Sequence, residues 1–287
     1  MEEKINWKLA QVLPDINNRI IVFDTETSGL SHFQDQILEI AAVEIIKGKI
    51  SGKQFHIYLK PLKKIKKQVS DINHIHTEDF KNYFEEYYDE EKNLMQNFLD
   101  FIGDDSIIFA HNMIFDFYFL NDELSKCNLK KLDPKRFRCS MRIFNEILKE
   151  NFPDLKVKKR LSDCCNYFNI MPYSLDGMFH NGLFDTIMTA KLICKLYDFK
   201  QGKIKKEDLL NNIMKYENTE KEKNLSEKNL NNEKKNEKQK ENINNNYYKD
   251  VVNNLYNIPY YIENTSDDNN LKEIANKLSM LSFSENK

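Results

Sequence analysis

Two acidic residues follow an apolar run near the amino terminus. Residues 20–23 read Ile-Ile-Val-Phe, which is typical of a buried β-strand, and Asp24 and Glu26 come directly after them. Side chains two apart on a strand point to the same face, so both carboxylates would project together. Such neighbours repel each other unless they share a proton or bind a divalent cation. The pair therefore predicts a metal site; the alternative is a strand that frays into a polar turn with both acids in solvent.

Two more acids occupy comparable positions later in the chain. Residues 106–110 read as a short buried strand, and Asp116 follows it where a helix is predicted to open. Asp185 opens another strongly helical segment, and His180 lies five positions before it. Carboxylate oxygens suit Mg²⁺ or Mn²⁺, and a histidine with an ordinary pKa of about 6.5 can accept a proton near neutral pH. These groups are the ones that metal-assisted hydrolysis requires.

The elements that must position these acids follow from local patterns. Strands are predicted over 36–46 and 54–59, joined by a tight turn at 47–49, so that the first three strands form an antiparallel meander. Helices are predicted over 94–102, from 111 through 124, and over 141–148 and 161–168. Residues 171–182 contain one proline and two glycines and predict a mobile loop that carries His180.

Composition narrows the class of protein. The chain has 287 residues and a formal net charge of -2, which excludes a strongly basic protein that coats nucleic acid, so any such contact is local. Its five cysteines have no C-x-x-C spacing, which argues against a disulfide framework and a structural zinc site. The sequence has no signal-peptide pattern and no apolar run of membrane-spanning length. We expect a cytoplasmic protein with no membrane partner.

Three motifs resemble the exonuclease motifs of the DEDD superfamily. They are F-D-T-E-T-S-G-L at 23–30, H-N-M-I-F-D at 111–116 and H-N-G-L-F-D at 180–185. The histidine five positions before the last aspartate is similar to that of the DEDDh, or DnaQ-like, branch. Segments elsewhere are similar to bacterial DNA polymerase III epsilon-type proofreading subunits, at 36–44, 55–61, 73–77 and 161–167. The chain departs from them in Ser28, in an insertion around 83–91 and in a longer carboxyl-terminal tail.

The resemblance implies an α/β, ribonuclease H-like fold, with a mixed five-stranded sheet flanked by helices. It also implies 3′→5′ removal of mononucleotides from a nucleic-acid end. Asp24, Glu26, Asp116 and Asp185 match the metal-binding acids, which would hold two divalent cations, Mg²⁺ or Mn²⁺, and His180 matches the general base. The matches to substrate-binding positions are Thr27, Gly29, Leu30, His74 and His111, with Leu30 as an apolar wedge against the base. His56 and His76 are interpreted as ordinary surface or strand histidines.

The composition changes after about residue 200, where Lys, Glu and Asn dominate. Such a segment has little to bury, which predicts a disordered linker. The expected organisation is an N-terminal extension over 1–18, an exonuclease domain over 19–200, a disordered linker over 201–250 and a partner-docking segment over 251–287. Residues 277–283, K-L-S-M-L-S-F, resemble peptides that dock on bacterial sliding clamps. The expected protein partners are therefore a DNA polymerase catalytic subunit and a sliding clamp.

The leading functional hypothesis is proofreading of DNA beside a replicative polymerase, on a single-stranded or frayed 3′ end. A site that admits only an unpaired strand selects mismatched ends without reading their sequence. An exoribonuclease that trims RNA ends is the alternative within the same chemistry, because such relatives share all five catalytic positions. A non-catalytic scaffold that retains the fold is the third hypothesis, and the presence of every catalytic position argues against it.

Overall fold

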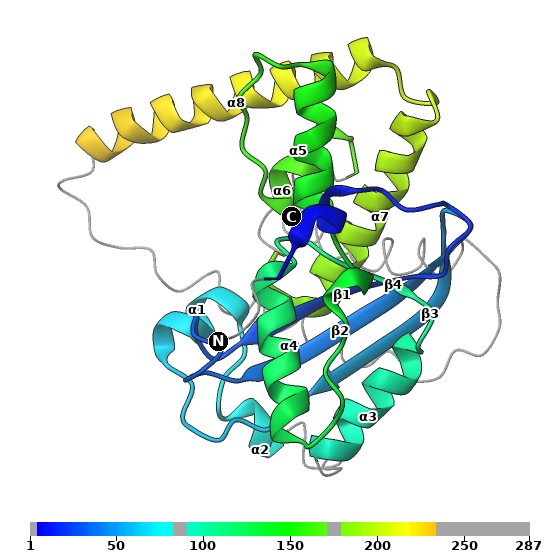
Figure 1. Ribbon diagram of the computed structural model, residues 1–287. Coiled ribbons are helices and arrows are strands. Elements are labelled where there is room, and N and C mark those ends of the chain that lie inside the picture. The colour runs from blue at the N-terminus through cyan, green and yellow to red at the C-terminus, as the bar shows by residue number, and fades with distance from the viewer. Residues whose placement is uncertain (1–4, 83–90, 171–178, 234–287) are drawn as a thin grey trace. The chain divides into compact units, whose positions relative to one another are not determined.

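Five strands form one mixed sheet in the computed structural model, which describes residues 5–82, 91–170 and 179–233 (Figure 1). The strands are β1 (Ile20–Thr27), β2 (Ile37–Ile46), β3 (Lys49–Tyr58), β4 (Ile107–Ala110) and β5 (Phe137–Cys139). Their order is β3-β2-β1-β4-β5, with β2 antiparallel to β1 and β3, and β4 parallel to β1 and β5. The mixed five-stranded sheet expected from the sequence is confirmed.

Helices cover both faces of this sheet. They are α1 (Lys67–Asn73), α2 (Asp79–Asn82), α3 (Glu91–Ile102), α4 (Ile114–Lys126), α5 (Ser140–Asn151), α6 (Leu161–Tyr167), α7 (Gly182–Lys200) and α8 (Lys206–Glu233), with 3₁₀ turns at Trp7–Gln11 and Pro134–Arg136. In Figure 1, α4 crosses in front of the strands and α7 lies behind them. The chain divides into two compact units, Met1–Met214 and Lys215–Lys287. Among the described residues, none of the helices has the length and apolar character needed to span a bilayer.

Strand β1 lies at the centre of the sheet and is apolar on both faces up to Phe23. Ile20 to Phe23 are completely buried. The ring of Phe23 lies 6.0 Å from that of Phe98 on α3 and 6.1 Å from that of Phe137 on β5. Pairing with β4 ends at Val22, opposite Phe109, whereas pairing with β2 continues to Thr27. The carboxyl end of β1, with Asp24 and Glu26, therefore extends beyond β4 and leaves one strand edge open to other groups.

The antiparallel meander rests on a two-residue turn between β2 and β3. Lys47 and Gly48 have φ angles of 50° and 73°, both in the left-handed region that such hairpin turns require. A Cβ on Gly48 would also lie 2.6 Å from Cδ1 of Ile16. The turn at 47–49 expected from the sequence is confirmed, and it sets the register of β3 against β2.

The structure differs from the sequence prediction in the region assigned to a linker. We predicted disorder over 201–250, but α8 is helical through Glu233. Lys and Glu have favourable helix propensities, and Leu209 and Ile213, one helical turn apart, are both fully buried. These few apolar residues are outnumbered by Lys, Glu and Asn, so the overall composition did not indicate a helix with a buried side. Residues 234–250 of the predicted linker, the docking segment 251–287 and most of the predicted loop at 171–182 lie outside the described residues.

Two short elements had no clear sequence signal. Strand β5 has three residues, too few for a period of two to be recognisable. The 3₁₀ turn at Trp7–Gln11 lies in the predicted N-terminal extension, and the ring of Trp7 contacts that of Phe117 edge-on at 4.9 Å. The amino-terminal segment thus adds to the core around α4.

Replacement of Phe23 tests the dependence of the fold on β1. Phe23→Ala removes a fully buried ring that contacts two others, and we expect the free energy of unfolding to fall by about 3 to 5 kcal/mol. Urea unfolding followed by circular dichroism measures it. Phe33, whose side chain is 82% exposed, gives the matched control Phe33→Ala, expected to change stability by less than about 0.5 kcal/mol. Equal losses in the two variants would contradict the central role of β1.

Candidate active site

Two carboxylates project from β1 toward the face that α7 covers. Asp24 and Glu26 are two residues apart on the strand, and their partners on β2 are Ala41 and Glu39. Burial raises the pKa of both carboxyl groups well above the ordinary range, and neighbouring carboxylates raise it further: Asp116, Asp185 and Glu26 around Asp24, and Glu39 and Asp185 around Glu26. Acids on three other elements therefore lie close to the end of β1.

Asp116 is held in the first turn of α4. Its side chain is buried, and Thr25 of β1 donates a hydrogen bond from Oγ1 to Asp116 Oδ1 at 2.7 Å. This bond crosses the edge of β1 that β4 leaves open. Burial raises the Asp116 pKa to about 7, although the Thr25 hydrogen bond opposes the shift. Asp116 thus lies close to Asp24, as expected from the sequence.

Asp185 lies in the first turn of α7, in a tightly hydrogen-bonded amino terminus. The side chain of Asn181 caps the helix by accepting the N–H of Phe184 at 3.0 Å, and the backbone N–H of His180 donates to Asp185 Oδ2 at 3.1 Å. Asp185 Oδ1 is buried and has no hydrogen-bond partner among the described residues. Burial raises the Asp185 pKa to about 7, and the charge of Glu39 adds to the shift.

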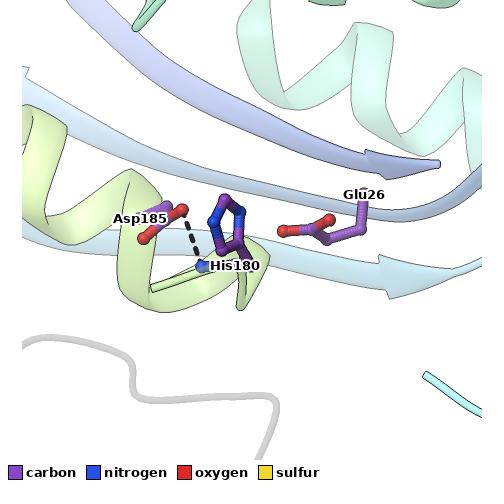
Figure 2. A group of neighbouring side chains, drawn as sticks. All are labelled: Glu26, His180 and Asp185. Atoms are coloured by element: carbon purple, nitrogen blue, oxygen red, sulfur yellow. Dashed lines mark hydrogen bonds between the residues drawn. The ribbon is translucent and has the colours of Figure 1, made fainter. Parts of the chain in front are cut away.

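Glu26, His180 and Asp185 form a compact group. Their ligand atoms all lie within 4.8 Å of one another, and Figure 2 shows the imidazole of His180 between the two carboxylates. The backbone of His180 has a φ angle of 71°, a conformation rare outside glycine and concentrated at functional sites. Burial lowers the His180 pKa, so the neutral imidazole prevails at pH 7. One side chain able to accept a proton thus lies among carboxylates able to bind a cation.

The segment after β1 presents the predicted substrate-binding residues. Thr27 donates from Oγ1 to the carbonyl of Gly29 at 2.6 Å, and Asn73 donates from Nδ2 to the Thr27 carbonyl at 3.2 Å. A Cβ on Gly29 would collide with the carboxylate of Asp35, so any other residue here would displace that side chain. Leu30 is 88% exposed. The Leu30 side chain thus lies in solvent, while hydrogen bonds of Thr27 hold the start of this segment in place.

The two remaining predicted histidines have different surroundings. Burial lowers the His74 pKa, and the nearby His76 and His180 lower it further, which places His74 close to the His180 side of the site. His111 is turned inward: Ser140 Oγ lies 2.8 Å from its Nδ1, and its Nε2 donates to the Lys159 carbonyl at 2.9 Å. Burial lowers the His111 pKa to about 4. The structure does not bring the His111 ring into the group of Glu26, His180 and Asp185, and its substrate contact stays a prediction.

Sequence analysis missed two polar residues beside the acids. Glu39 is fully buried on β2 opposite Glu26, and His56 on β3 contacts it, with 2.7 Å between His56 Nε2 and Glu39 Oε1. We had interpreted His56 as an ordinary strand histidine. One feature of the sequence could have indicated a special role for Glu39: it is an acid inside an otherwise apolar run, Ile37-Leu38-Glu39-Ile40-Ala41-Ala42. A carboxylate in such a run needs a partner, because an unpaired buried charge is strongly unfavourable.

The sequence of this chain is similar to those of known proteins. A family model described as Exonuclease matches residues 21–193. DNA polymerase III subunit epsilon of Buchnera aphidicola subsp. Schizaphis graminum is 34% identical over 184 residues, which cover 62% of this chain and 72% of that protein. The subunit epsilon of Rickettsia prowazekii is 31% identical over 202 residues, which cover 68% of this chain and 82% of that protein.

Solved structures support the fold. A zinc-bound complex of E. coli exonuclease I with single-stranded DNA matches with a TM-score of 0.53 and 16% sequence identity, over 68% of this chain and 43% of that one. The chain thus spans less than half the length of this structural neighbour, and at this identity the likeness concerns the fold alone. The family model, which covers every predicted catalytic residue, and the epsilon-subunit relatives show that the chain belongs to the exonuclease family, as a DEDDh-type 3′–5′ exonuclease.

Proposed function

We propose that this enzyme removes mononucleotides from DNA 3′ ends as the proofreading partner of a bacterial replicative polymerase, in the cytoplasm. The observation that carries the proposal is the buried acidic cluster around Asp185, whose Oδ1 atom has no hydrogen-bond partner among the described residues. The substrate and the polymerase partner follow from relatives that are named as epsilon subunits of DNA polymerase III. The sliding clamp stays a prediction that rests on residues 277–283, which lie outside the described residues.

The donor set fits divalent cations. Asp24, Glu26, Asp116 and Asp185 would hold two ions, Mg²⁺ or Mn²⁺, because hard carboxylate oxygens are the ligands that these ions prefer. The raised pKa of each acid has burial as its main cause, so a cation that neutralises the cluster would relieve an existing penalty. Divalent cations held by these acids would lower the pKa of a coordinated water and neutralise charge on the phosphodiester.

His180 supplies the general base in this proposal. Its backbone N–H donates the 3.1 Å hydrogen bond to Asp185, so the residue is held just before the first turn of α7, which carries that acid. Because burial keeps the imidazole neutral at pH 7, a ring nitrogen can accept the proton of the attacking water. The ring is only partly buried, so water and substrate can still reach it.

Recognition of the terminal nucleotide falls to the segment after β1. Leu30, exposed at 88%, would pack against the terminal base, Thr27 and Gly29 would line its approach, and His74, whose pKa the nearby His180 lowers, would lie beside it. An apolar wedge contacts any base, so selection would come from the ease with which a 3′ end separates from its partner strand. This is the property that distinguishes a mismatched end from a paired one.

Digestion of matched, 3′-mismatched and single-stranded substrates tests the proposed function. With Mg²⁺ or Mn²⁺, we expect release of mononucleotides from the 3′ end, faster from mismatched than from matched DNA, because the frayed end reaches the site more often. Asp24→Ala is the blank. Faster digestion of single-stranded RNA than of DNA of equal length would move the protein to the RNA-trimming group, and activity no greater than that of the blank would contradict the enzyme assignment.

The acidic cluster predicts how pH and metal affect stability. The pKa values of Asp116 and Asp185 are raised to about 7 in the folded, metal-free protein. The folded state therefore binds protons more tightly than the unfolded chain between about pH 4 and pH 7, and stability present below this range is lost as pH rises through 7. With a chelator, we expect the thermal midpoint to fall from pH 5 to pH 8, and Mn²⁺ to restore it at pH 8.

Asp24→Asn is the control for this measurement. It removes one charge from the cluster, so the fall in thermal midpoint should be smaller and the gain from Mn²⁺ should shrink. Identical pH dependence in the wild type and the variant would show that the cluster does not govern stability.

Replacement of His180 tests the general base. His180→Gln should lower kcat by about 10²- to 10⁴-fold at saturating metal, because the water loses its proton acceptor. Burial lowers the His180 pKa, so wild-type kcat should rise with pH below neutrality and level off above it, and the variant should lack this rise. His76→Gln, at an exposed histidine, is the matched control and should leave kcat within about twofold. An unchanged pH profile in His180→Gln would refute the role.

A further inference from the structure

Glu39 is a fifth carboxylate at this site, and the proposed reaction does not use it. Its side chain is 1% exposed, and it lies on β2 opposite Glu26 in the antiparallel register. Its charge is among those that raise the pKa values of Asp24, Glu26 and Asp185. A further acid would only add repulsion here unless its contacts hold other parts of the site.

The two oxygens of Glu39 contact two different elements. Oε1 lies 2.7 Å from Nε2 of His56 on β3, and Oε2 accepts the backbone N–H of Gly182 at 3.3 Å. Gly182 is the first residue of α7, and it lies between His180 and Asp185 in the chain. One carboxylate therefore connects β3 to the start of α7, which carries Asp185 and begins just after His180.

The contact at Gly182 is close enough that any side chain there would displace the Glu39 carboxylate. A Cβ at this position would lie 2.9 Å from both Cδ and Oε1 of Glu39. Thr186, about one turn further along α7, donates from Oγ1 to the Ala41 carbonyl at 3.2 Å. Glu39 and Ala41 are the β2 partners of Glu26 and Asp24. The start of α7 is thus docked on the two β2 residues that lie beside the acids of β1.

We propose that Glu39 and His56 form a positioning pair for the metal-binding acids, an inference that rests on the proposed function. His56 orients the carboxylate, and Glu39 accepts the first N–H of α7, where the helix dipole favours negative charge. This contact fixes Asp185 and His180 relative to Asp24 and Glu26, although they come from segments far apart in the sequence. Groups that hold metal ligands in this way typically change affinity or activity 10- to 100-fold when removed.

The experiment uses the full chain, a single-stranded DNA oligonucleotide and Mn²⁺. Glu39→Gln should lower kcat by about 10- to 100-fold and weaken Mn²⁺ binding, measured by calorimetry, while KM for the oligonucleotide stays unchanged. Glu39→Asp keeps the charge but shortens the side chain, so it should be as impaired as Glu39→Gln. His56→Gln should lower kcat as well, and the double variant Glu39→Gln/His56→Gln should be little worse than Glu39→Gln, because the two residues act as one unit.

Glu44→Gln is the matched control. Glu44 is also buried on β2 and is paired at 2.7 Å with Arg19, away from the metal-binding acids. Its replacement should lower the thermal midpoint and leave kcat and Mn²⁺ affinity of the folded protein intact.

Three outcomes would overturn the inference. One is wild-type kcat and Mn²⁺ affinity in Glu39→Gln, another is full activity in Glu39→Asp, and the third is a loss of stability alone that matches Glu44→Gln. A wild-type protein without nuclease activity would instead refute the proposed function. The Mn²⁺ titration would still decide whether Glu39 and His56 position the acids.

Discussion

Asp24, Glu26, Asp116 and Asp185 bring carboxylates together in surroundings from which water is largely excluded. Burial removes hydration from a carboxylate, and each like charge nearby adds repulsion, so the pKa of every one of these groups is raised. A cluster of this kind lowers the stability of the metal-free fold. It persists because the surrounding elements are rigid, and a divalent cation can relieve desolvation and repulsion together.

The sheet provides that rigidity through its central strand. Strand β1 is apolar on both faces up to Phe23, then extends beyond β4, so its acids project from a fixed base into a region where strand pairing stops. Asp116 and Asp185 each come from the first turn of a helix, where the helix dipole favours negative charge. Thr25 connects the first of these turns to β1, and Glu39 connects the second to β2.

Two buried acids of β2 show how position decides the role of a residue. Glu44 is paired with Arg19, whose guanidinium also donates to the carbonyls of Phe101 and Ile102 at the end of α3. That network joins a strand to a helix terminus and lies away from the acids at the end of β1. Glu39 has a histidine partner and lies against the start of α7, beside Glu26. The same residue type on the same strand thus supports the fold in one place and adjoins the reactive groups in the other.

The sequence alone identified the candidate site acids, the general-base candidate and most of the elements that carry them. Local patterns suffice for these, since β-branched runs give β1 and β2, and helical spacing gives α3, α4 and α7. They could not give β5, which is too short to show a period, or α8, whose apolar residues are few among Lys, Glu and Asn. His111 matched a substrate-binding position, but both of its ring nitrogens are engaged by Ser140 and Lys159.

Only the tertiary structure decided how Glu39, His56 and Gly182 meet. Their contact depends on the register of three strands and on the docking of α7 across a separation of 143 residues between Glu39 and Gly182. A sequence pattern reports which face of its own element a residue occupies. It does not report what the facing element places there, because that follows from how all the elements pack together.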